Sequence, residues 1–362
     1  MSETLIFILE TQEGTMAYYL TIKADVHHSE EKRNEEGGVS DMWRKNVLPF
    51  QGDKNKSPYF EGWYYKQVSS NQQTALSLIV GMSVTKEDSH SFIQYIFVSK
   101  NNQGKSITKT GYSRFSLDDF VYQKDPFVVK IADNLFSESL ISVHLEDDDI
   151  NIAGNLRLEK FQDIKRTAYS PTIMGPFTYI PHMECQHEVV SMSHFLEGSL
   201  EINNRSIDFT GGKGYIEKDW GRSFPKDYIW IQSNHFNDNQ RSLFFSYAHI
   251  PFYGKAFQGF ICSFYDKRKE YRFATYNASK IAVTYPSDVA VAIELESTEG
   301  ILKLKAIIKT EGELIAPLES GMQKAIKEGI EGEVYLSFFN KKTKQTIEDK
   351  GIMAGIELVD ES

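Results

Sequence analysis

Hydrophobic and polar residues alternate along much of the chain. Between Ile150 and Leu158, every second position holds an aliphatic residue or glycine, and polar residues such as Asn151 and Arg157 lie between them. The same alternation occurs at 289–295 and 334–338. Strict alternation is typical of strands with one buried and one solvated face, as in antiparallel sheets. We therefore predict an all-β protein.

Turn-forming residues separate these runs. Segments rich in Asn, Asp and Gly lie at 101–104, 147–149, 203–204, 211–212, 237–239 and 298–300. Such residues favour tight turns, and many short strands between frequent turns are typical of sandwiches or closed barrels. The strand–helix rhythm of a parallel sheet is not seen. The predicted strands therefore belong to antiparallel β-barrels.

One segment has a helical pattern. Between Pro317 and Ile330, apolar residues recur at spacings of three or four. They are Leu318, Met322, Ala325 and Ile326. This spacing predicts a short amphipathic helix near the C-terminus. We expect it to pack against the end of a barrel.

The two halves of the chain echo each other. The sequence YYKQVSSN at 64–71 precedes an apolar run, and YIWIQSN at 228–234 precedes another, at an offset of about 165 residues. This offset is right for two tandem domains and too long for a solenoid repeat. We predict an irregular N-terminal leader over 1–42, a first barrel over 43–205 and a second over 206–362.

Composition narrows the class of protein. The 362 residues include 40 Lys and Arg against 50 Asp and Glu, for a net charge of −10, which disfavours a nucleic-acid partner. No apolar run approaches the roughly 20 residues of a membrane-spanning helix, and the run from Leu5 to Leu9 is too short for a signal peptide. The two cysteines, Cys185 and Cys262, form no disulfide framework, so a cytoplasmic location is expected. Oligomeric state is not indicated.

Aromatic residues make up 13% of the chain, an excess that suits both strands and the walls of apolar ligand cavities. One aromatic cluster is FEGWYYK at 60–66. On a strand, Glu61 and Trp63 share one face and Tyr64 lies on the other. The alternative is an ordinary aromatic strand whose Glu61 points into water or pairs with a lysine.

A second cluster, PHMECQH at 181–187, carries His182, Glu184 and His187. It lacks the spacing of a zinc-binding helix and a second nearby cysteine, so no metal site is predicted. Hydrogen-bonded structural histidines are the alternative to a catalytic role.

The third cluster runs from Gly214 to His235. Glu217 and Asp219 lie two residues apart, so a strand presents both carboxyl groups to one side, where Trp220 and Trp230 can form aromatic walls. Burial against aromatic rings raises the pKa of a carboxyl group and makes a proton donor available near neutrality. In the alternative interpretation, Lys218 and Arg222 balance these acids at a surface turn.

Together the three clusters resemble the tocopherol cyclase family. The resemblance rests on FEGWYYK at 60–66, PHMECQHEVVSMSHFLEGSL at 181–200 and GYIEKDWGRSFPKDYIWIQSN at 214–234, and it extends from about Trp43 to the C-terminus. Related carotenoid hydratases and AttH-like proteins share a tandem lipocalin-like fold. The resemblance thus implies two lipocalin-like barrels.

The resemblance also implies a chemistry. Cyclases of this family add a phenol oxygen to a prenyl double bond, and the hydratases add water to one. Both reactions begin with protonation of an alkene, which needs an acid in a dry pocket and aromatic faces to stabilise a carbocation. We expect Asp219 to be the acid, partnered by Glu217 or Glu61, with His182 or His187 handling the phenol.

The expected substrate contacts come from the same three clusters. They are Trp63, Tyr64, Glu184, Trp220, Trp230, Gln232 and Asn234. No cofactor is implied. The segment from Tyr271 onward is expected to be scaffold, since the motifs precede it.

Two other functions fit the same residues. A lipocalin-like carrier would bind a hydrophobic small molecule without turnover. A glycosidase-like hydrolase would use the carboxyl groups and aromatics on a sugar. A plastid transit peptide like that of the plant enzymes is not expected from the N-terminal residues, so a substrate other than theirs is also considered.

Overall fold

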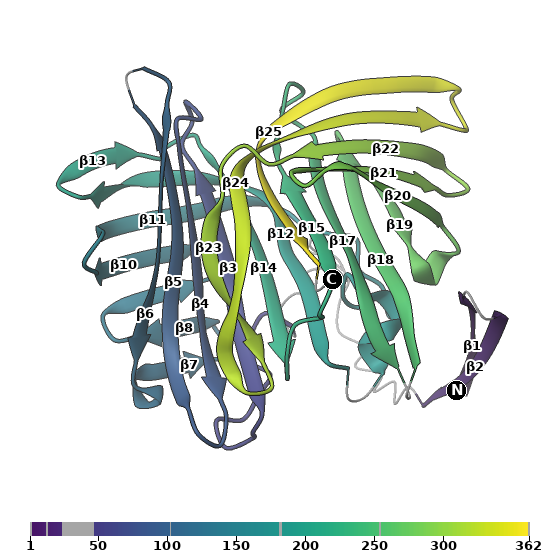
Figure 1. Ribbon diagram of the computed structural model, residues 1–362, viewed down its shortest axis with the longest axis horizontal. Helices are drawn as coiled ribbons and strands as arrows, with labels where there is room; N and C mark the ends of the chain where they lie inside the picture. The colour runs from purple at the N-terminus through teal and green to yellow at the C-terminus, as the bar shows by residue number, and fades with distance from the viewer. Residues whose placement is uncertain are drawn as a thin grey trace, which may run out of the picture.

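The computed structural model describes residues 2–11, 14–23, 47–101, 103–180, 183–252 and 255–360. The described residues form two large antiparallel sheets and a separate hairpin (Figure 1). The all-β prediction is confirmed. The hairpin pairs β1 (Ser2–Thr11) with β2 (Gly14–Lys23). The rest of the predicted leader, up to residue 42, lies outside the described residues.

The first sheet has 12 strands, and its neighbours follow the order β6-β5-β4-β3-β14-β12-β11-β10-β9-β8-β7, with β13 paired to β12. The strands are β3 (Tyr59–Val68), β4 (Thr74–Val84), β5 (Ser89–Lys100), β6 (Ser106–Phe115), β7 (Phe120–Gln123), β8 (Val128–Ile131), β9 (Asn134–Ser137), β10 (Leu140–Glu146), β11 (Asn151–Gln162), β12 (Cys185–Ile202), β13 (Arg205–Asp208) and β14 (Lys213–Gly221).

The second sheet has 11 strands in the order β19-β18-β17-β15-β25-β24-β22-β21-β20, with β16 paired to β25 and β23 to β24. The strands are β15 (Tyr228–Ser233), β16 (His235–Phe236), β17 (Ser242–Phe252), β18 (Lys255–Asp266), β19 (Lys269–Ala274), β20 (Lys280–Ser287), β21 (Ala290–Glu296), β22 (Gly300–Ile307), β23 (Gly312–Leu318), β24 (Gly321–Asn340) and β25 (Gln345–Val359). The short 3₁₀ helices are η1 (Leu117–Asp119), η2 (Gly175–Tyr179) and η3 (Thr275–Asn277).

The two sheets repeat one topology. In each sheet, the first four long strands form a meander that ends at one edge of the sheet. The chain then starts again at the opposite edge and adds strands inward, until its last long strand pairs with the first strand of the meander. Those closing pairs are β3 with β14 and β15 with β25. The sequence echo thus marks equivalent strands β3 and β15 of two tandem units. The hydrogen-bonded sheets divide between β14 and β15, at 222–227, whereas the domain boundary at 205/206 stays a prediction.

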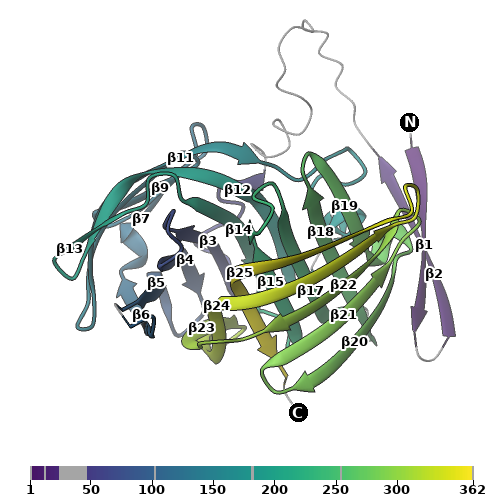
Figure 2. The same ribbon diagram turned by 90° about the horizontal axis from the view of Figure 1, so that it is seen from above.

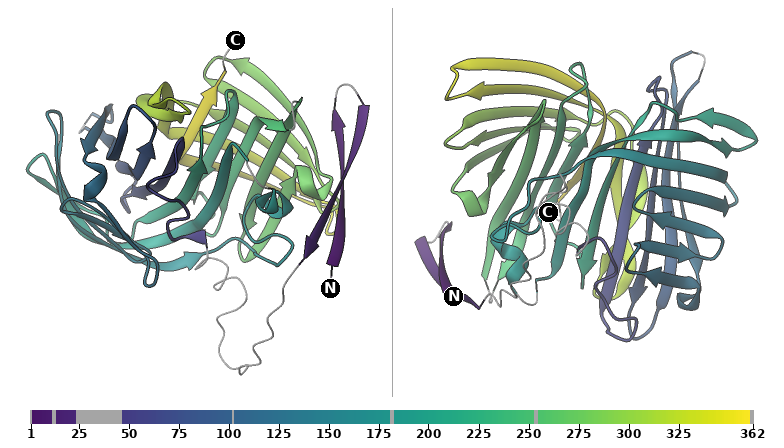
Figure 3. Two further views of the ribbon diagram at one scale, coloured as in Figure 1. Left: turned by 90° about the horizontal axis from the view of Figure 1, so that it is seen from below. Right: turned by 180° about the vertical axis from the view of Figure 1, so that it is seen from behind.

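Each sheet is strongly curved, as Figures 2 and 3 show from above, below and behind, and each has its own hydrophobic core. The first core joins side chains of both ends of its sheet, for example Leu78 and Ile93 with Ile131 and Leu156. The second core likewise joins side chains from both ends of its sheet, for example Phe245 of β17 and Leu304 of β22. The alternation of buried and exposed residues in β11 and β21 matches the predicted period of two.

The predicted helix over 317–330 is wrong. These residues form the end of β23 and the first half of β24. From Ile326 to Phe338, every even-numbered residue of β24 is buried, which is the pattern of a strand. A spacing of four fits both periods, because four residues make two strand repeats and about one helical turn. The intervening Gly329 and Gly332 also disfavour a helix.

The two sheets meet where β24 lies against β4 and β5 and where β12 lies against β17, and β23 lies beside β5 and β6 (Figure 1). Gln94 of β5 ties the sheets together, since its side-chain amide donates to the Ile315 carbonyl at 3.1 Å and accepts from the Ile315 N–H at 2.8 Å. No helix in the described ranges is long and apolar enough to cross a membrane.

Candidate functional site

A largely apolar cavity lies between the two sheets. Its walls come from β3, β4, β5, β12 and β14 of the first sheet, from β15, β17, β18 and β23–β25 of the second, and from η2. Its free volume is ≈ 180 Å³. Apolar walls with a few converging polar groups are typical of small-molecule sites.

The polar groups of the cavity belong to two rows, each made of residues that lie directly opposite one another on neighbouring strands of one sheet. In the first sheet, Tyr64 on β3 lies directly opposite Glu217 on β14. In the second sheet, Trp230 on β15 lies opposite Glu357 on β25, which lies opposite Glu328 on β24. Each row thus combines an aromatic residue with carboxyl groups, at equivalent places in the repeated topology.

The aromatic residue of each row donates a hydrogen bond to a carboxyl group of the other row. The Tyr64 hydroxyl of the first sheet donates to Glu328 Oε1 of the second at 2.5 Å. Trp230 Nε1 of the second sheet donates to Glu217 Oε2 of the first at 2.9 Å. The Tyr64 and Trp230 rings pack edge to face, 5.5 Å apart. Gly355 makes room for the indole, because a Cβ there would lie 2.4 Å from the Trp230 ring.

Glu217 is a buried acid among aromatic rings. Both of its close hydrogen bonds, from the Tyr215 hydroxyl at 2.6 Å and from Trp230, end on Oε2. Burial, together with the charge of Asp219, raises the pKa of Glu217 to about 7. Glu217 therefore carries a proton in a substantial fraction of molecules at neutral pH.

His187 connects Glu217 to Asp219. Its Nδ1 lies 2.7 Å from Asp219 Oδ1, and its Nε2 lies 3.8 Å from Glu217 Oε2. Burial lowers the pKa of His187, but the charge and hydrogen bond of Asp219 and the charge of Glu217 outweigh it, and the pKa rises to about 9. The imidazole is thus held as a cation between two acids. His187, Glu217 and Asp219 all line the cavity. Glu217 and Asp219 share one face of β14, and His187 comes from the neighbouring strand β12, where it lies opposite Asp219.

Sequence reasoning missed Glu328 and Glu357. Both line the cavity and are buried, so the segment from Tyr271 onward, which was expected to be scaffold, contributes to the cavity wall. Burial raises the pKa of Glu328 to about 8, and it also raises that of Glu357, to which the charge of Glu328 contributes. A signal was present, because Glu328 sits between the apolar Ile326 and Ile330 at an inward position. The helical interpretation hid it.

Glu61 and Trp63 lie on the opposite face of β3 from the cavity. Glu61 is fully buried and pairs with Lys218 Nζ at 2.6 Å, and it also accepts hydrogen bonds from Tyr59 and from the N–H groups of Gln51 and Gly52. Trp63 packs in the first core. The structure therefore does not bring these two side chains together with Asp219.

The other predicted contacts divide between cavity and scaffold. Tyr64, Glu184 and Trp230 line the cavity, and Glu184 accepts a hydrogen bond from Ser223 at 2.5 Å. Trp220 packs against the first core. Gln232 and Asn234 are buried and bind Lys66 and the Gly214 carbonyl. His182 lies outside the described residues.

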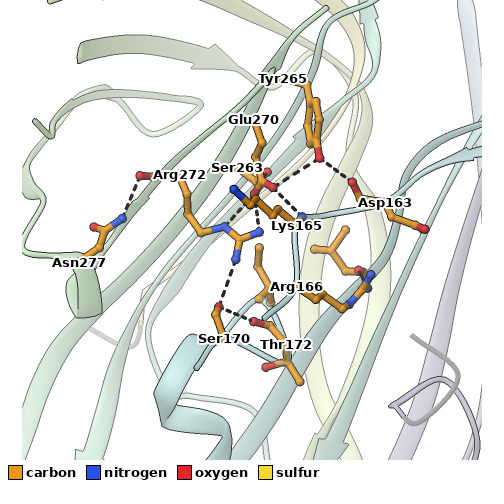
Figure 4. Close-up of polar contacts among 12 residues, drawn as sticks. Asp163, Lys165, Arg166, Ser170, Thr172, Ser263, Tyr265, Glu270, Arg272 and Asn277 are labelled. Carbon is orange, nitrogen blue, oxygen red and sulfur yellow. Dashed lines mark hydrogen bonds and ion pairs between the residues drawn. The ribbon is translucent and has the colours of Figure 1, made fainter. Parts of the chain in front are cut away.

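A connecting segment closes one side of the cavity. Residues 163–180, here called the strap, join β11 to β12 and carry Met174 and Phe177 into the cavity wall. The strap crosses from the first sheet to the second, where Glu270 accepts from the Lys165 N–H at 2.7 Å and Arg272 Nη1 donates to Ser170 at 3.3 Å (Figure 4).

Two tyrosines of the second sheet also hold the strap. The Tyr265 hydroxyl donates to the Asp163 carbonyl at 2.6 Å (Figure 4), and the Tyr276 hydroxyl donates to the Ile173 carbonyl at 3.0 Å. Gly175 adopts a φ of +59°, and a Cβ there would lie 2.7 Å from the Tyr276 ring. The strap is thus fixed by both polar contacts and packing.

Removing both tyrosine hydroxyls, in Tyr265→Phe/Tyr276→Phe, is expected to loosen the strap. Each lost hydrogen bond costs about 1 kcal/mol, so amide hydrogen exchange over 163–180 should accelerate roughly tenfold or more. Tyr271→Phe is the matched control, because its hydroxyl contacts Asn340 rather than the strap. Equal exchange over 163–180 in the double variant and the control would contradict this role.

Comparison with known proteins places these features in context. Residues 161–359 match the family model described as "Tocopherol cyclase-like". This match covers the strap, the strands β12 and β14 that carry His187, Glu217 and Asp219, and the whole second sheet.

Crystal structures of CghA share the fold. A crystal structure of CghA has a TM-score of 0.56 with 8% identity, covering 88% of this chain and 93% of CghA. The structure of CghA with Sch210972 has a TM-score of 0.54 with 9% identity, covering 84% and 89%. Kievitone hydratase from Nectria haematococca has a TM-score of 0.49 with 11% identity, covering 86% and 94%. The predicted fold of two tandem lipocalin-like barrels is confirmed.

Proposed function

Because the chain belongs to the tocopherol cyclase-like family, we propose that it is an enzyme that protonates a carbon–carbon double bond of an apolar, prenylated substrate. The substrate lies in the cavity between the two sheets. The resulting carbocation is captured either by a hydroxyl of the same molecule, which closes a ring, or by water.

One observation carries this proposal. Glu217, a buried acid with a pKa raised to about 7, faces an apolar cavity and touches His187 and Trp230. A general acid works best when its pKa lies near the working pH. The faces of Tyr64 and Trp230 favour a developing positive charge nearby, and the dry surroundings strengthen that attraction.

The roles follow from the contacts. The sequence pointed first to Asp219 as the acid, with Glu217 or Glu61 as its partner. The geometry favours the reverse assignment, because Asp219 Oδ1 is engaged by His187 while the close contacts of Glu217 leave Oε1 to carry a proton. His187, held by Asp219, replaces the proton that Glu217 gives up. His187 and Asp219 are then positioning and proton-return groups.

The step conserves atoms and electrons. The alkene π electrons form a C–H bond with the Glu217 proton and leave a cation on the neighbouring carbon. An oxygen lone pair then forms the C–O bond, and the oxygen loses its proton to a base in the cavity. Cyclisation leaves the substrate mass unchanged, whereas hydration adds one water.

A carrier without turnover is the second candidate. It is supported by the apolar walls of the cavity and by its enclosure by the strap. A carrier needs no acid of raised pKa, so the acid group around Glu217 favours the enzyme.

The test is incubation of the protein with a prenylated hydroquinone under reducing conditions, followed by chromatography with mass detection. A product of unchanged mass and shifted retention identifies a cyclase, and a product heavier by one water identifies a hydratase. Ligand retained without product would favour the carrier.

Asp219→Asn provides the matched variant for this assay. Removal of the carboxylate lowers the pKa of His187, because Asp219 is the largest influence that raises it. We expect turnover to fall by about 10²-fold with substrate affinity retained. Loss of affinity and turnover in equal measure, or loss of neither, would count against this role.

A further inference from the structure

Gly62 lies inside β3, where a glycine is costly, because it loses the most backbone entropy on folding and has no side chain to pack. A Cβ at this position would fit. It would make only ordinary contacts, 3.6 Å from the Val80 carbonyl oxygen and 3.9 Å from the side chains of Ile79 and Phe92. The backbone at Gly62 does not have a left-handed φ. Neither packing nor backbone conformation therefore requires a glycine here.

The other glycines of the two sheets differ from Gly62. Gly81 of β4 lies directly opposite it, and a Cβ on Gly81 would lie 2.4 Å from the Glu61 carbonyl oxygen. In the described strands of the two large sheets, every glycine other than Gly62 has either an atom within 3.0 Å of its Cβ position or a left-handed φ. Gly62 lines the cavity and is partly accessible, whereas the rest of β3 is buried. The missing side chain thus leaves room in the cavity.

Aromatic residues surround this space beside Gly62, here called the niche. Phe60 and Tyr64 precede and follow Gly62 on the same face of β3, and Phe92 of β5 lies opposite Gly81. All three aromatic residues are buried and line the cavity. Aromatic rings attract a positive charge through their faces. The niche therefore suits an alkene and the carbocation that protonation makes from it.

The niche also lies beside the proposed acid. Asp219 on β14 is the cross-strand partner of Gly62, and Glu217 is the diagonal neighbour of Gly62, because it lies opposite Tyr64. Side chains directly opposite each other begin about 5 Å apart, and diagonal ones about 7–8 Å apart. A double bond in the niche is therefore within reach of Glu217, and a cation formed there lies next to the charge of Asp219.

We propose that Gly62 determines substrate specificity, because the niche left by its missing side chain holds the reacting prenyl double bond. A side chain at this position would occupy the place of the double bond and move it away from Glu217. This inference rests on the proposed function, since it places the substrate of that reaction. It identifies the part of the substrate that contacts β3 as hydrocarbon.

The test measures the binding of two probes, a prenylated hydroquinone and the same hydroquinone without its prenyl chain, by quenching of tryptophan fluorescence, because Trp230 lies in the cavity. Burial of the prenyl group makes us expect wild-type protein to bind the prenylated probe at least about tenfold more tightly. This preference should fall about threefold in Gly62→Ala and at least about tenfold in Gly62→Val, since the added methyl groups fill the niche.

Two features of the design guard against a structural artefact. Ala282→Val, at an exposed position of β20, is the matched control for added bulk on a strand and should keep the preference. Gly62→Ala keeps the test valid if Gly62→Val does not fold, because its Cβ makes only ordinary contacts. The binding of the probe without a prenyl chain should stay at the wild-type level in Gly62→Ala.

The outcomes separate this inference from the proposed function. A preference that falls in Gly62→Ala supports the niche even if no product forms, in which case the reaction alone fails. A preference unchanged in the Gly62 variants overturns the inference, while turnover by the wild-type protein would leave the reaction standing. Equal loss of affinity for both probes overturns it too, because the substitution would then disturb the cavity as a whole. Absence of any preference in wild-type protein also overturns it.

Discussion

Replacing Glu217 with glutamine is expected to lower kcat roughly 10²–10⁴-fold while changing KM little. Glutamine keeps the shape of the side chain and can still accept from Trp230, but it has no acidic proton. Only an interaction made in the transition state is lost, so binding of the ground-state substrate should survive. Steady-state kinetics with a prenylated hydroquinone measure both constants.

The pH dependence gives an independent check on Glu217. The proposed acid must be protonated, so kcat should fall as the pH rises through about 7, the pKa to which burial raises this group. Glu333→Gln on the same strand as Glu328 is a control, because Glu333 pairs with Lys350 rather than lining the cavity. A rise in KM at constant kcat in Glu217→Gln would mean that Glu217 only binds substrate.

Replacing Glu61 with glutamine is expected to destabilise the fold by about 3–5 kcal/mol, a larger effect than for any surface pair. Glu61 and Lys218 are both fully buried, and Lys218 Nζ lies between the rings of Trp63 and Trp220, at 4.9 and 4.8 Å from their centres. Loss of the carboxylate leaves this lysine charged in a low-dielectric site. Urea denaturation monitored by tryptophan fluorescence measures the change.

A second substitution tests whether the unpaired charge of Lys218 causes the loss of stability. In Glu61→Gln/Lys218→Met the unpaired cation is absent, so much of the lost stability should return. Folded Glu61→Gln protein should bind a prenylated hydroquinone normally, because this side chain faces the first core rather than the cavity. A turnover defect without a change in stability would instead support the catalytic role that the sequence analysis considered for Glu61.

Much of the site follows from local alternation. Because side chains on a strand alternate, the sequence placed Glu217 and Asp219 on one face and separated Tyr64 from Glu61 and Trp63 on β3. Those relations hold in the structure, where Tyr64 lines the cavity and Trp63 lies in a core. The repeat between residues 64–71 and 228–234 likewise marked equivalent strands of two sheets.

Relations between distant segments required the tertiary structure. Glu328 meets Tyr64 across 264 residues of chain, and no local period encodes that distance. The spacing from Leu318 to Ile326 fits a helix and a strand equally, and only the pairing of β23 with β24 decides for the strand. Local sequence thus determines which side chains share a face, because that depends on the backbone of one strand. Which faces enclose the cavity depends on how two sheets pack.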